Sequence, residues 1–226
     1  MPQRTRPRRR RQTRRPILPW LLTALLVILG GKLLSDTVFP ILKVQQLENV
    51  ETPDWIDVQL IDIDGHSRRG EKLKAVRDIV IHYVGNPGTT AQANRDYFAG
   101  SDSTVSAHFV VGLDGEIIQC VPLSEKSSAS NDRNGDTISI EVCHPDETGK
   151  FNEAAYNALV KLTAWLLDQC GLKSNHIIRH YDVTGKLCPL YFVEHEDAWV
   201  QFQKDVKYYR PQASVSDKSI PTRKES

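Results

Sequence analysis

The chain has 226 residues, 40% of them hydrophobic and 25% charged, and a formal net charge of +1. That length is short for two full domains, and the composition shows no excess of Gly, Pro or Cys that would indicate a fibrous or disulfide-stapled protein. The charge is uneven, because residues 1–15 contain eight arginines and no acid, which leaves about −7 (+1 − 8) on the remainder.

The first predicted element is an apolar segment behind these arginines. Residues 16–31 carry no charge, and the apolar run continues past Lys32, close to the ~20 residues that a bilayer-spanning helix needs. Trp20 lies where an interfacial aromatic anchor is expected. The pattern predicts a basic cytoplasmic tail over 1–15 and a transmembrane signal anchor over 16–36. It places the chain in the cell membrane as a single-pass protein whose larger part, residues 40–226, lies outside the cytoplasm.

Two other interpretations of the N-terminal region carry less weight. A cleaved signal peptide also has a basic head and an apolar stretch, but no small-x-small cleavage site stands out between Gly30 and Pro40. An arginine tail can bind nucleic acid, yet the apolar segment behind it favours a topology signal. We therefore expect no nucleic-acid partner.

Strand and helix patterns alternate along the rest of the chain. β-branched runs and strict alternation predict strands, and an apolar stripe at helical spacing, capped by Gly171, predicts a long helix. The predicted strands span residues 55–64, 78–84, 105–112, 116–121, 137–143 and 176–180, and the predicted helices about 89–98, 152–170 and 195–209. This order predicts an α/β domain over 55–209 with a single mixed central β-sheet flanked by helices. Residues 37–54 are expected to form an extended stalk and residues 210–226 a disordered tail.

Three residues could form a metal site. His82 lies in a buried β-branched strand, where an imidazole needs a partner. His180 ends a second such strand, and Cys188 follows eight residues later. A hydrolytic zinc site uses three nitrogen or thiolate ligands and keeps one position open. From the residues alone, each histidine could also be structural and Cys188 a small buried thiol.

The other histidines and cysteines offer weaker patterns. His176 and His180 are four residues apart and would share the face of a helix, but the isoleucines between them favour a strand. Cys120, Cys143 and Cys170 have no paired spacing. We expect reduced, mostly buried thiols in place of a disulfide framework.

Two charged residues could act on a reacting group. Glu141 lies in an alternating strand that places Ile138 and Ile140 on the opposite face. Its carboxylate could be a general base with a pKa raised by partial burial, or a solvated residue of an edge strand. Lys186 could stabilise an oxyanion, or be a solvated loop lysine.

Five stretches of the chain, in this order and spacing, resemble a known family. They are SRRGEKL, IVIHYVGNPGTTAQANRDYF, VSAHFVVGLDGEIIQCVP, TISIEVC and HYDVTGKLCP. Together they resemble the zinc-dependent N-acetylmuramoyl-L-alanine amidases of the phage-lysozyme and peptidoglycan-recognition-protein superfamily, in particular the Gram-positive bacterial branch. The resemblance puts His82, His180 and Cys188 on the zinc ligands, Glu141 on the catalytic glutamate and Lys186 on a lysine of the phage enzymes.

The chain departs from the family pattern in two places. The phage enzymes have a catalytic tyrosine where this chain has Ala107, so no tyrosine role is carried over, and His108 is expected to be structural. Many relatives have a histidine in the loop after the hairpin. Residues 124–136 contain none, which leaves the substrate contacts of that loop open.

The resemblance implies a Zn²⁺-dependent peptidoglycan hydrolase that cleaves the amide between N-acetylmuramic acid and the L-alanine of the stem peptide. In this reading Glu141 takes the proton of the attacking water, and Lys186 shares the oxyanion charge with zinc. The alternative is a non-catalytic peptidoglycan-binding receptor of the same fold. Such members typically lose the cysteine ligand, so Cys188 and Glu141 favour the enzyme. The expected partners are peptidoglycan and, through the anchor, the membrane, and the chain is expected to be monomeric.

Overall fold

The computed structural model describes residues 28, 30–32, 35, 39–63 and 66–213. The chain divides into two compact units, residues 1–39 and 40–226. All the candidate site residues lie in the second unit, and the architecture below is that of this unit alone.

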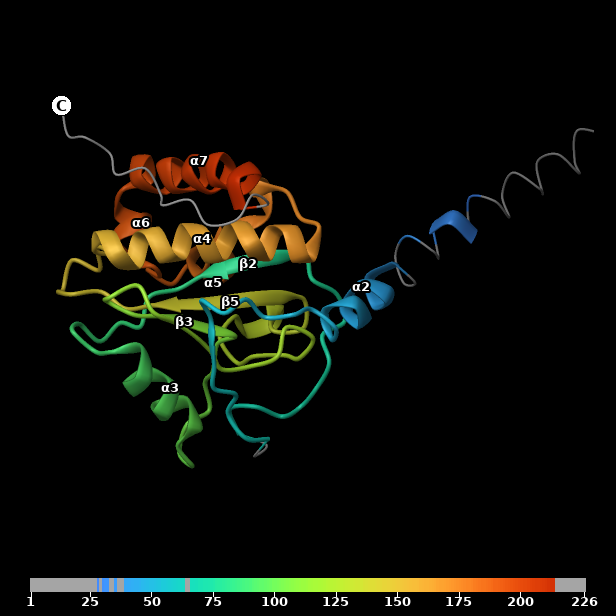
Figure 1. Ribbon diagram of the computed structural model, residues 1–226, viewed down its shortest axis with the longest axis horizontal. Coiled ribbons are helices and arrows are strands. Elements are labelled where there is room, and N and C mark those ends of the chain that lie inside the picture. The colour runs from blue at the N-terminus through green and yellow to red at the C-terminus, as the bar shows by residue number, and fades with distance from the viewer. Residues whose placement is uncertain (1–27, 29, 33–34, 36–38, 64–65, 214–226) are drawn as a thin grey trace, which may run out of the picture. The chain divides into compact units, whose positions relative to one another are not determined.

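A six-stranded mixed sheet forms the centre of the second unit (Figure 1). Its strands are β1 (Asp57–Val58), β2 (Asp78–Ile81), β3 (Phe109–Val111), β4 (Ile117–Gln119), β5 (Thr137–Val142) and β6 (Ile177–Arg179). They are ordered β1-β4-β3-β5-β2-β6. β3 and β4 form the predicted antiparallel hairpin, and the other neighbouring pairs are parallel.

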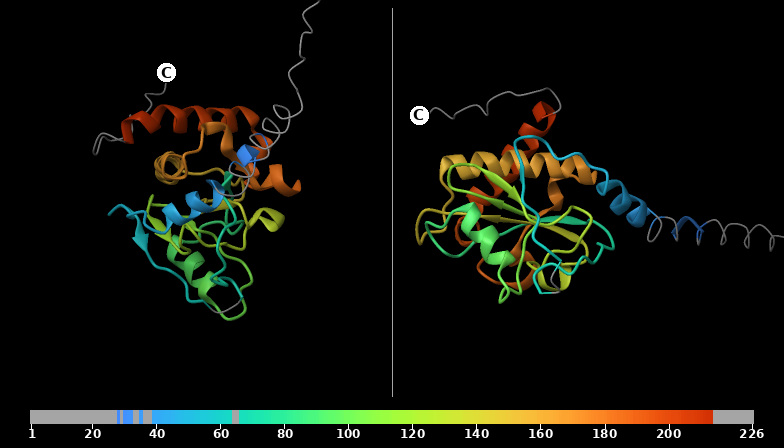
Figure 2. Two further views of the ribbon diagram at one scale, coloured as in Figure 1. Left: turned by 90° about the vertical axis from the view of Figure 1, so that its right-hand side faces the viewer. Right: turned by 60° about the horizontal axis from the view of Figure 1, so that its bottom comes forward.

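Helices cover both faces of this sheet (Figures 1 and 2). They are α2 (Phe39–Leu47), α3 (Ala91–Ala99), α4 (Glu153–Cys170), α5 (His180–Thr184), α6 (Leu190–Glu194) and α7 (Glu196–Ala213), with 3₁₀ turns η2 (Asn131–Arg133) and η3 (Ser174–His176). α4 packs on one face and is itself covered by α7, whereas α3 packs on the other face against β3 and β4. The predicted α/β architecture with a mixed central sheet is confirmed.

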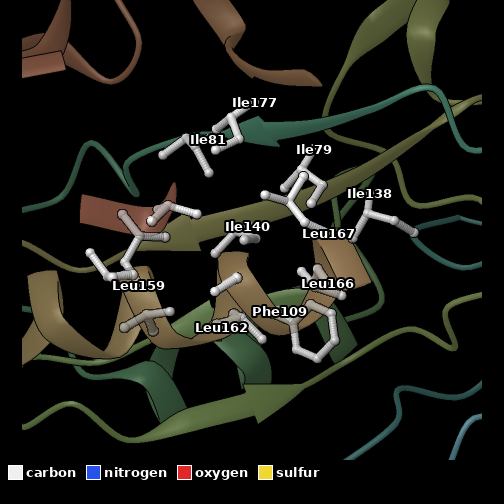
Figure 3. Packing of buried hydrophobic residues seen from close by; sticks show 14 of the residues in the cluster. Ile79, Ile81, Phe109, Ile138, Ile140, Leu159, Leu162, Leu166, Leu167 and Ile177 are labelled. Carbon is white, nitrogen blue, oxygen red and sulfur yellow. The ribbon is translucent and has the colours of Figure 1, made fainter. Parts of the chain in front are cut away.

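Alternation along β5 divides its side chains between two layers. Ile138 and Ile140 point toward α4 and pack in the main core with Leu162 (Figure 3). Cys143 belongs to a smaller cluster on the α3 side of the sheet. Glu141 therefore lies on the face opposite the main core, as the alternation predicted, and the large apolar face fixes the register of the strand.

Several predicted elements differ in extent. The expected strand over 55–64 is reduced to the two residues of β1, both exposed. Beyond them only isolated backbone bonds continue toward β4, such as Ile61 N–H to Cys120 O at 3.0 Å. The loop predicted after β6 contains the short helices α5 and α6.

Helices lie at both ends of the predicted domain. The expected stalk over 37–54 contains α2, which buries Val44 and Leu47 in the main core. α7 continues past the predicted end at 209 to Ala213. The predicted basic tail over 1–15 lies outside the described residues, and the domain boundaries stay a prediction.

The predicted membrane location needs correction. Within residues 28, 30–32, 35, 39–63 and 66–213, none of the helices combines the length and the apolar character needed to cross a membrane. The fully described helix closest to the predicted anchor, α2, has nine residues, against the ~20 of a spanning helix. Most of the predicted anchor over 16–36 lies outside the described residues. This finding contradicts the prediction of a single-pass protein of the cell membrane, and with it the membrane as a partner.

The start of α4 provides a test of the fold. Asn152 caps the helix by accepting a hydrogen bond from Ala155 N–H at 2.9 Å, and its amide donates to Leu113 O at 2.9 Å. We predict that Asn152→Ala lowers the free energy of unfolding by about 1–2 kcal/mol, because both bonds are lost. Urea denaturation followed by circular dichroism measures this change. Asn157→Ala, inside the same helix, is the matched control and should change stability by no more than ~0.5 kcal/mol.

Candidate metal centre

Parallel pairing of β2 and β6 brings two histidines to one edge of the sheet. Ile81 pairs with Arg179 in the ladder, so the residues that follow these strands, His82 and His180, emerge side by side. Their ring centroids are 4.6 Å apart, and both side chains are buried.

The turn after β6 returns the third candidate ligand to this edge. His180 opens α5, and Gly185 ends that helix in a left-handed conformation with φ +77°. Tyr181 N–H then donates to the backbone carbonyl of Cys188 at 2.9 Å. The chain is thereby closed into a compact loop, and Cys188 is buried beside the two imidazoles.

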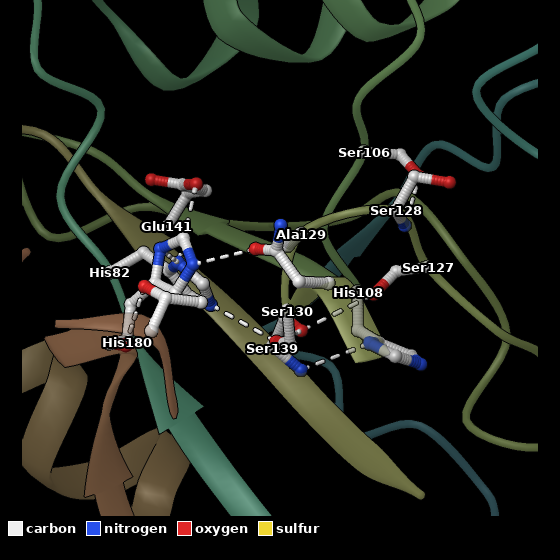
Figure 4. Close-up of polar contacts among 12 residues, drawn as sticks. His82, Ser106, His108, Ser127, Ser128, Ala129, Ser130, Ser139, Glu141 and His180 are labelled. Atoms are coloured by element: carbon white, nitrogen blue, oxygen red, sulfur yellow. Dashed lines mark hydrogen bonds and ion pairs between the residues drawn. The ribbon is translucent and has the colours of Figure 1, made fainter. Parts of the chain in front are cut away.

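The three side chains direct ligand atoms at one another. One ring nitrogen of each histidine and the Cys188 sulfur all lie within 4.8 Å of one another. The two Nδ1 atoms face each other at 3.2 Å. The outer nitrogens have separate partners. His180 Nε2 lies 3.0 Å from Asn131 Oδ1. His82 Nε2 lies 3.4 Å from Ser130 Oγ (Figure 4).

Glu141 lies beside this triad. Its Oε1 is 3.9 Å from His82 Nδ1, and its Oε2 is buried with no hydrogen-bond partner among the described residues. Burial raises the pKa of this carboxyl to about 8, and the positive charge of Lys186 acts in the opposite direction. An unpartnered buried carboxylate oxygen next to converging nitrogen and sulfur donors is what a cation would satisfy. The residues therefore fit a metal ion with an open coordination position.

Burial also controls the protonation of the candidate ligands. It lowers the pKa of His82 well below its usual value, helped by His180 and Lys186, and it lowers the pKa of His180 in the same way. Neutral imidazole is the form that binds a metal. Burial raises the pKa of the Cys188 thiol to about 12, so a bound ion would have to displace its proton.

The triad opens into a cleft of about 1230 Å³. Lys186, exposed in the loop after α5, is one of its lining residues, and Tyr97 of α3 lines it as well. The loop whose contacts the sequence left open lines the cleft as well. It contributes Lys126, Ser127, Ser128, Ala129, Asn131 and Asn134.

Two other histidines considered in the sequence analysis, His176 and His108, do not join His82, His180 and Cys188. His176 Nδ1 is 3.1 Å from Asp78 Oδ1, at the opposite ends of the strands. His108 is fully buried, and its Nδ1 accepts from Ser139 N–H at 3.0 Å. Its Nε2–H then donates to Glu125 O at 2.8 Å, and burial lowers its pKa to about 4. Both ring nitrogens serve the backbone, which supports the structural role expected of this residue.

Sequence reasoning missed Ser130 and Asn131. The run SASNDRNGD indicates a turn, and Asn131 is the one non-glycine residue with a positive φ, 52°, in the described part of the chain. Nothing in the run shows that its side chains face two histidines from other strands. The expected reduced thiols are found: all four cysteines are free and buried.

The raised pKa of Glu141 predicts a pH effect on the metal-free protein. Between its ordinary pKa of 4.5 and about 8, the folded chain keeps a proton that the unfolded chain loses, so stability falls as pH rises through this window. We predict that Glu141→Gln reduces this pH-dependent loss of the free energy of unfolding by an amount on the order of a few kcal/mol. Urea unfolding with a chelator, at about pH 5 and about pH 8, measures it. The exposed Glu147→Gln is the control, and identical pH slopes for wild type and Glu141→Gln would contradict the buried carboxyl.

Comparisons with known proteins agree on one family. The family model described as N-acetylmuramoyl-L-alanine amidase matches residues 72–190, 119 of the 226 residues and so just over half of the chain. The chain is 31% identical over 183 residues to the N-acetylmuramoyl-L-alanine amidase CwlL of Bacillus licheniformis, covering 74% of this chain and 50% of the relative. It is 30% identical over 184 residues to BlyA of Bacillus subtilis (strain 168), covering 72% and 49%.

A solved structure supports the same assignment. A mutant endolysin from Bacillus subtilis superposes with a TM-score of 0.59 at 28% identity, covering 67% of this chain and 97% of that one. The chain spans about half the length of the curated relatives it matches. The predicted superfamily and the prediction of an amidase are confirmed at the level of the family. This chain belongs to the N-acetylmuramoyl-L-alanine amidase family.

Proposed function

We propose that the chain is a zinc-dependent peptidoglycan hydrolase that cleaves the amide between N-acetylmuramic acid and the L-alanine of the stem peptide. One observation carries the proposal. A ring nitrogen of His82, a ring nitrogen of His180 and Cys188 Sγ converge at the wall of an open cleft, beside a Glu141 carboxyl whose Oε2 has no partner among the described residues. Family membership supports amide hydrolysis of peptidoglycan.

The three candidate ligand atoms favour zinc over other metal ions. Two imidazole nitrogens and one thiolate are ligands that Zn²⁺ prefers, and hard cations such as Mg²⁺ and Ca²⁺ take oxygen ligands instead. Held by His82, His180 and Cys188, zinc would supply Lewis-acid activation of the scissile carbonyl and of the attacking water. Two neutral imidazoles and one thiolate leave a net positive charge at the centre, which favours this chemistry.

Glu141 is proposed to move the proton. Its Oε1 lies 3.9 Å from a ligand nitrogen, close enough to reach a water that attacks a carbonyl placed in the cleft. The carboxylate accepts the proton of that water and passes it to the leaving amine of L-alanine, which closes the proton balance of hydrolysis. The raised pKa is that of the metal-free site, and it would fall toward the range that a base needs at neutral pH if a cation were held beside Glu141.

Lys186 is proposed to balance the negative charge that develops on the carbonyl oxygen. Its charge shifts the pKa values of His82, His180, Glu141 and Cys188, so it acts on the whole centre. The side chain is exposed at the border of the cleft. A bound substrate would exclude water there and strengthen the interaction.

A receptor that binds peptidoglycan without cleaving it would need the cleft alone. Such a protein has no use for a buried thiol placed against two histidines, or for a carboxylate held without a partner. The presence of Cys188 and Glu141 at one point therefore favours the hydrolase.

Defined muropeptides test the function directly. We expect the full chain to release a peptide with a free N-terminal L-alanine and an unmodified sugar, identified by mass spectrometry. A chelator should abolish release, and zinc should restore it. Binding of the muropeptide with no product in the zinc-loaded protein would support the receptor, and cleavage at another bond would contradict the proposed specificity.

Glu141 can be tested separately from the metal. We predict that Glu141→Ala keeps stoichiometric zinc but loses roughly 10²–10⁴-fold in kcat, because it removes proton transfer and not a ligand. Product release and metal content are measured on the same sample. Glu147→Ala, an exposed carboxylate in the next loop, serves as the control. Full activity of Glu141→Ala with zinc bound would rule out this base.

A further inference from the structure

Two consecutive residues contact the outer nitrogens of both candidate metal-binding histidines. Ser130 Oγ lies 3.4 Å from His82 Nε2 (Figure 4), and Asn131 Oδ1 lies 3.0 Å from His180 Nε2. His82 follows β2 and His180 follows β6, so one loop contacts both rings on the side away from their facing Nδ1 atoms. What holds the outer nitrogen of a ligating histidine also fixes its orientation and tautomer.

The loop that carries these residues is braced. The side-chain oxygen of Asn134 accepts from Ala129 N–H at 3.1 Å and from Ser130 N–H at 2.6 Å. Arg133 donates to Asp78 at 2.6 Å and to Asp136 at 2.7 Å. Since Asp78 begins β2, the strand that leads to His82, the loop is attached to the same strand as one of the rings it contacts.

The left-handed backbone of Asn131 indicates that its side chain is needed at this position. Its φ of 52° lies in the left-handed region, which non-glycine residues adopt at a cost on the order of 1 kcal/mol. Asparagine tolerates the region better than other side chains, but glycine would do so without cost. The side chain is exposed toward the cleft, so core packing does not account for an asparagine here.

Asn131 and Ser130 differ in whether they fix the tautomer of the histidine that each contacts. An amide oxygen only accepts, so Asn131 requires the proton of His180 on Nε2 and leaves the Nδ1 lone pair facing His82. The hydroxyl of Ser130 can donate or accept, and it also lies 3.0 Å from Ser139 Oγ. Asn131 is therefore the partner that selects a tautomer, whereas Ser130 follows the state of His82.

We propose that Asn131 is a positioning residue of the metal centre, which holds His180 in the Nε2–H tautomer with Nδ1 directed at the ion. The proposal rests on the metal site of the proposed function and adds to it a residue that acts on the ion through His180. It accounts for the strained backbone, the braced loop and the acceptor at 3.0 Å together.

Variants at this position separate backbone from side chain. Asn131→Gly keeps the left-handed backbone and removes the acceptor, whereas Asn131→Asp keeps an acceptor in a residue that also tolerates this conformation. Asp132→Ala, at the neighbouring exposed position outside the cleft lining, is the matched control. The zinc Kd of each full-length variant is measured by competition with a chromophoric chelator at neutral pH. ¹⁵N NMR of the metal-free protein reports the His180 tautomer.

We expect Asn131→Gly to bind zinc about 10–100-fold more weakly and to show a mixture of His180 tautomers. Asn131→Asp should bind as tightly as wild type or tighter, and Asp132→Ala should match wild type. Wild-type zinc affinity in Asn131→Gly, or equal losses in the Gly and Asp variants, would overturn the proposal. These readouts need no substrate, so a wild-type protein that binds zinc and cleaves nothing refutes the proposed function while the comparison at Asn131 still decides this inference.

Discussion

The site depends on the parallel pairing of β2 with β6. The ladder that matches Ile81 with Arg179 determines that the next residue of each strand is a histidine at the same edge of the sheet. A shift of one residue in either strand would send one imidazole to the opposite face. The buried apolar face beneath α4 opposes such a shift, because Ile79, Ile81 and Ile177 are almost fully buried in it. Packing on one face of the sheet thus keeps His82 and His180 side by side at its edge.

The polar groups at that edge of the sheet lower the stability of the folded protein when no cation is bound. Two Nδ1 atoms face each other at 3.2 Å, a thiol is buried with its pKa raised to about 12, and a carboxylate oxygen has no partner in the described structure. Buried polar groups normally find hydrogen bonds. By contrast, both ring nitrogens of His108, just before β3, are hydrogen-bonded, one of them to Ser139 of β5. The concentration of unsatisfied groups at one point of the cleft is typical of a site built for an ion and a reaction and not for stability.

The sequence predicted much of this site and for identifiable reasons. His82 and His180 each terminate a β-branched run, and alternation in β5 assigned Glu141 to the correct face, since period-2 patterns survive folding when one face is buried. The spacing of His180 and Cys188 permitted a shared ion without requiring it. The resemblance to the amidases supplied the choice, and the geometry of the three side chains agrees with it.

Other features could not be predicted, because they arise from contacts between distant segments. The helix α2 forms where prolines and mixed polarity indicated an extended stalk, because tertiary burial of Val44 and Leu47 stabilises it. The membrane prediction relied on hydropathy in a region largely outside the described residues, and no described helix supports it. The sequence indicates only a turn at Ser130 and Asn131, and their contacts with His82 and His180 arise from the tertiary fold.

We propose that one zinc ion binds between His82 Nδ1, His180 Nδ1 and Cys188 Sγ. X-ray absorption at the zinc K edge, measured on the zinc-loaded full chain, tests this coordination. We expect a first coordination shell with two nitrogen ligands at about 2.0–2.1 Å, one sulfur at about 2.3 Å and one further light atom. The sulfur should disappear in Cys188→Ser. A shell of oxygen and nitrogen alone in the wild-type protein would contradict the assignment of the site.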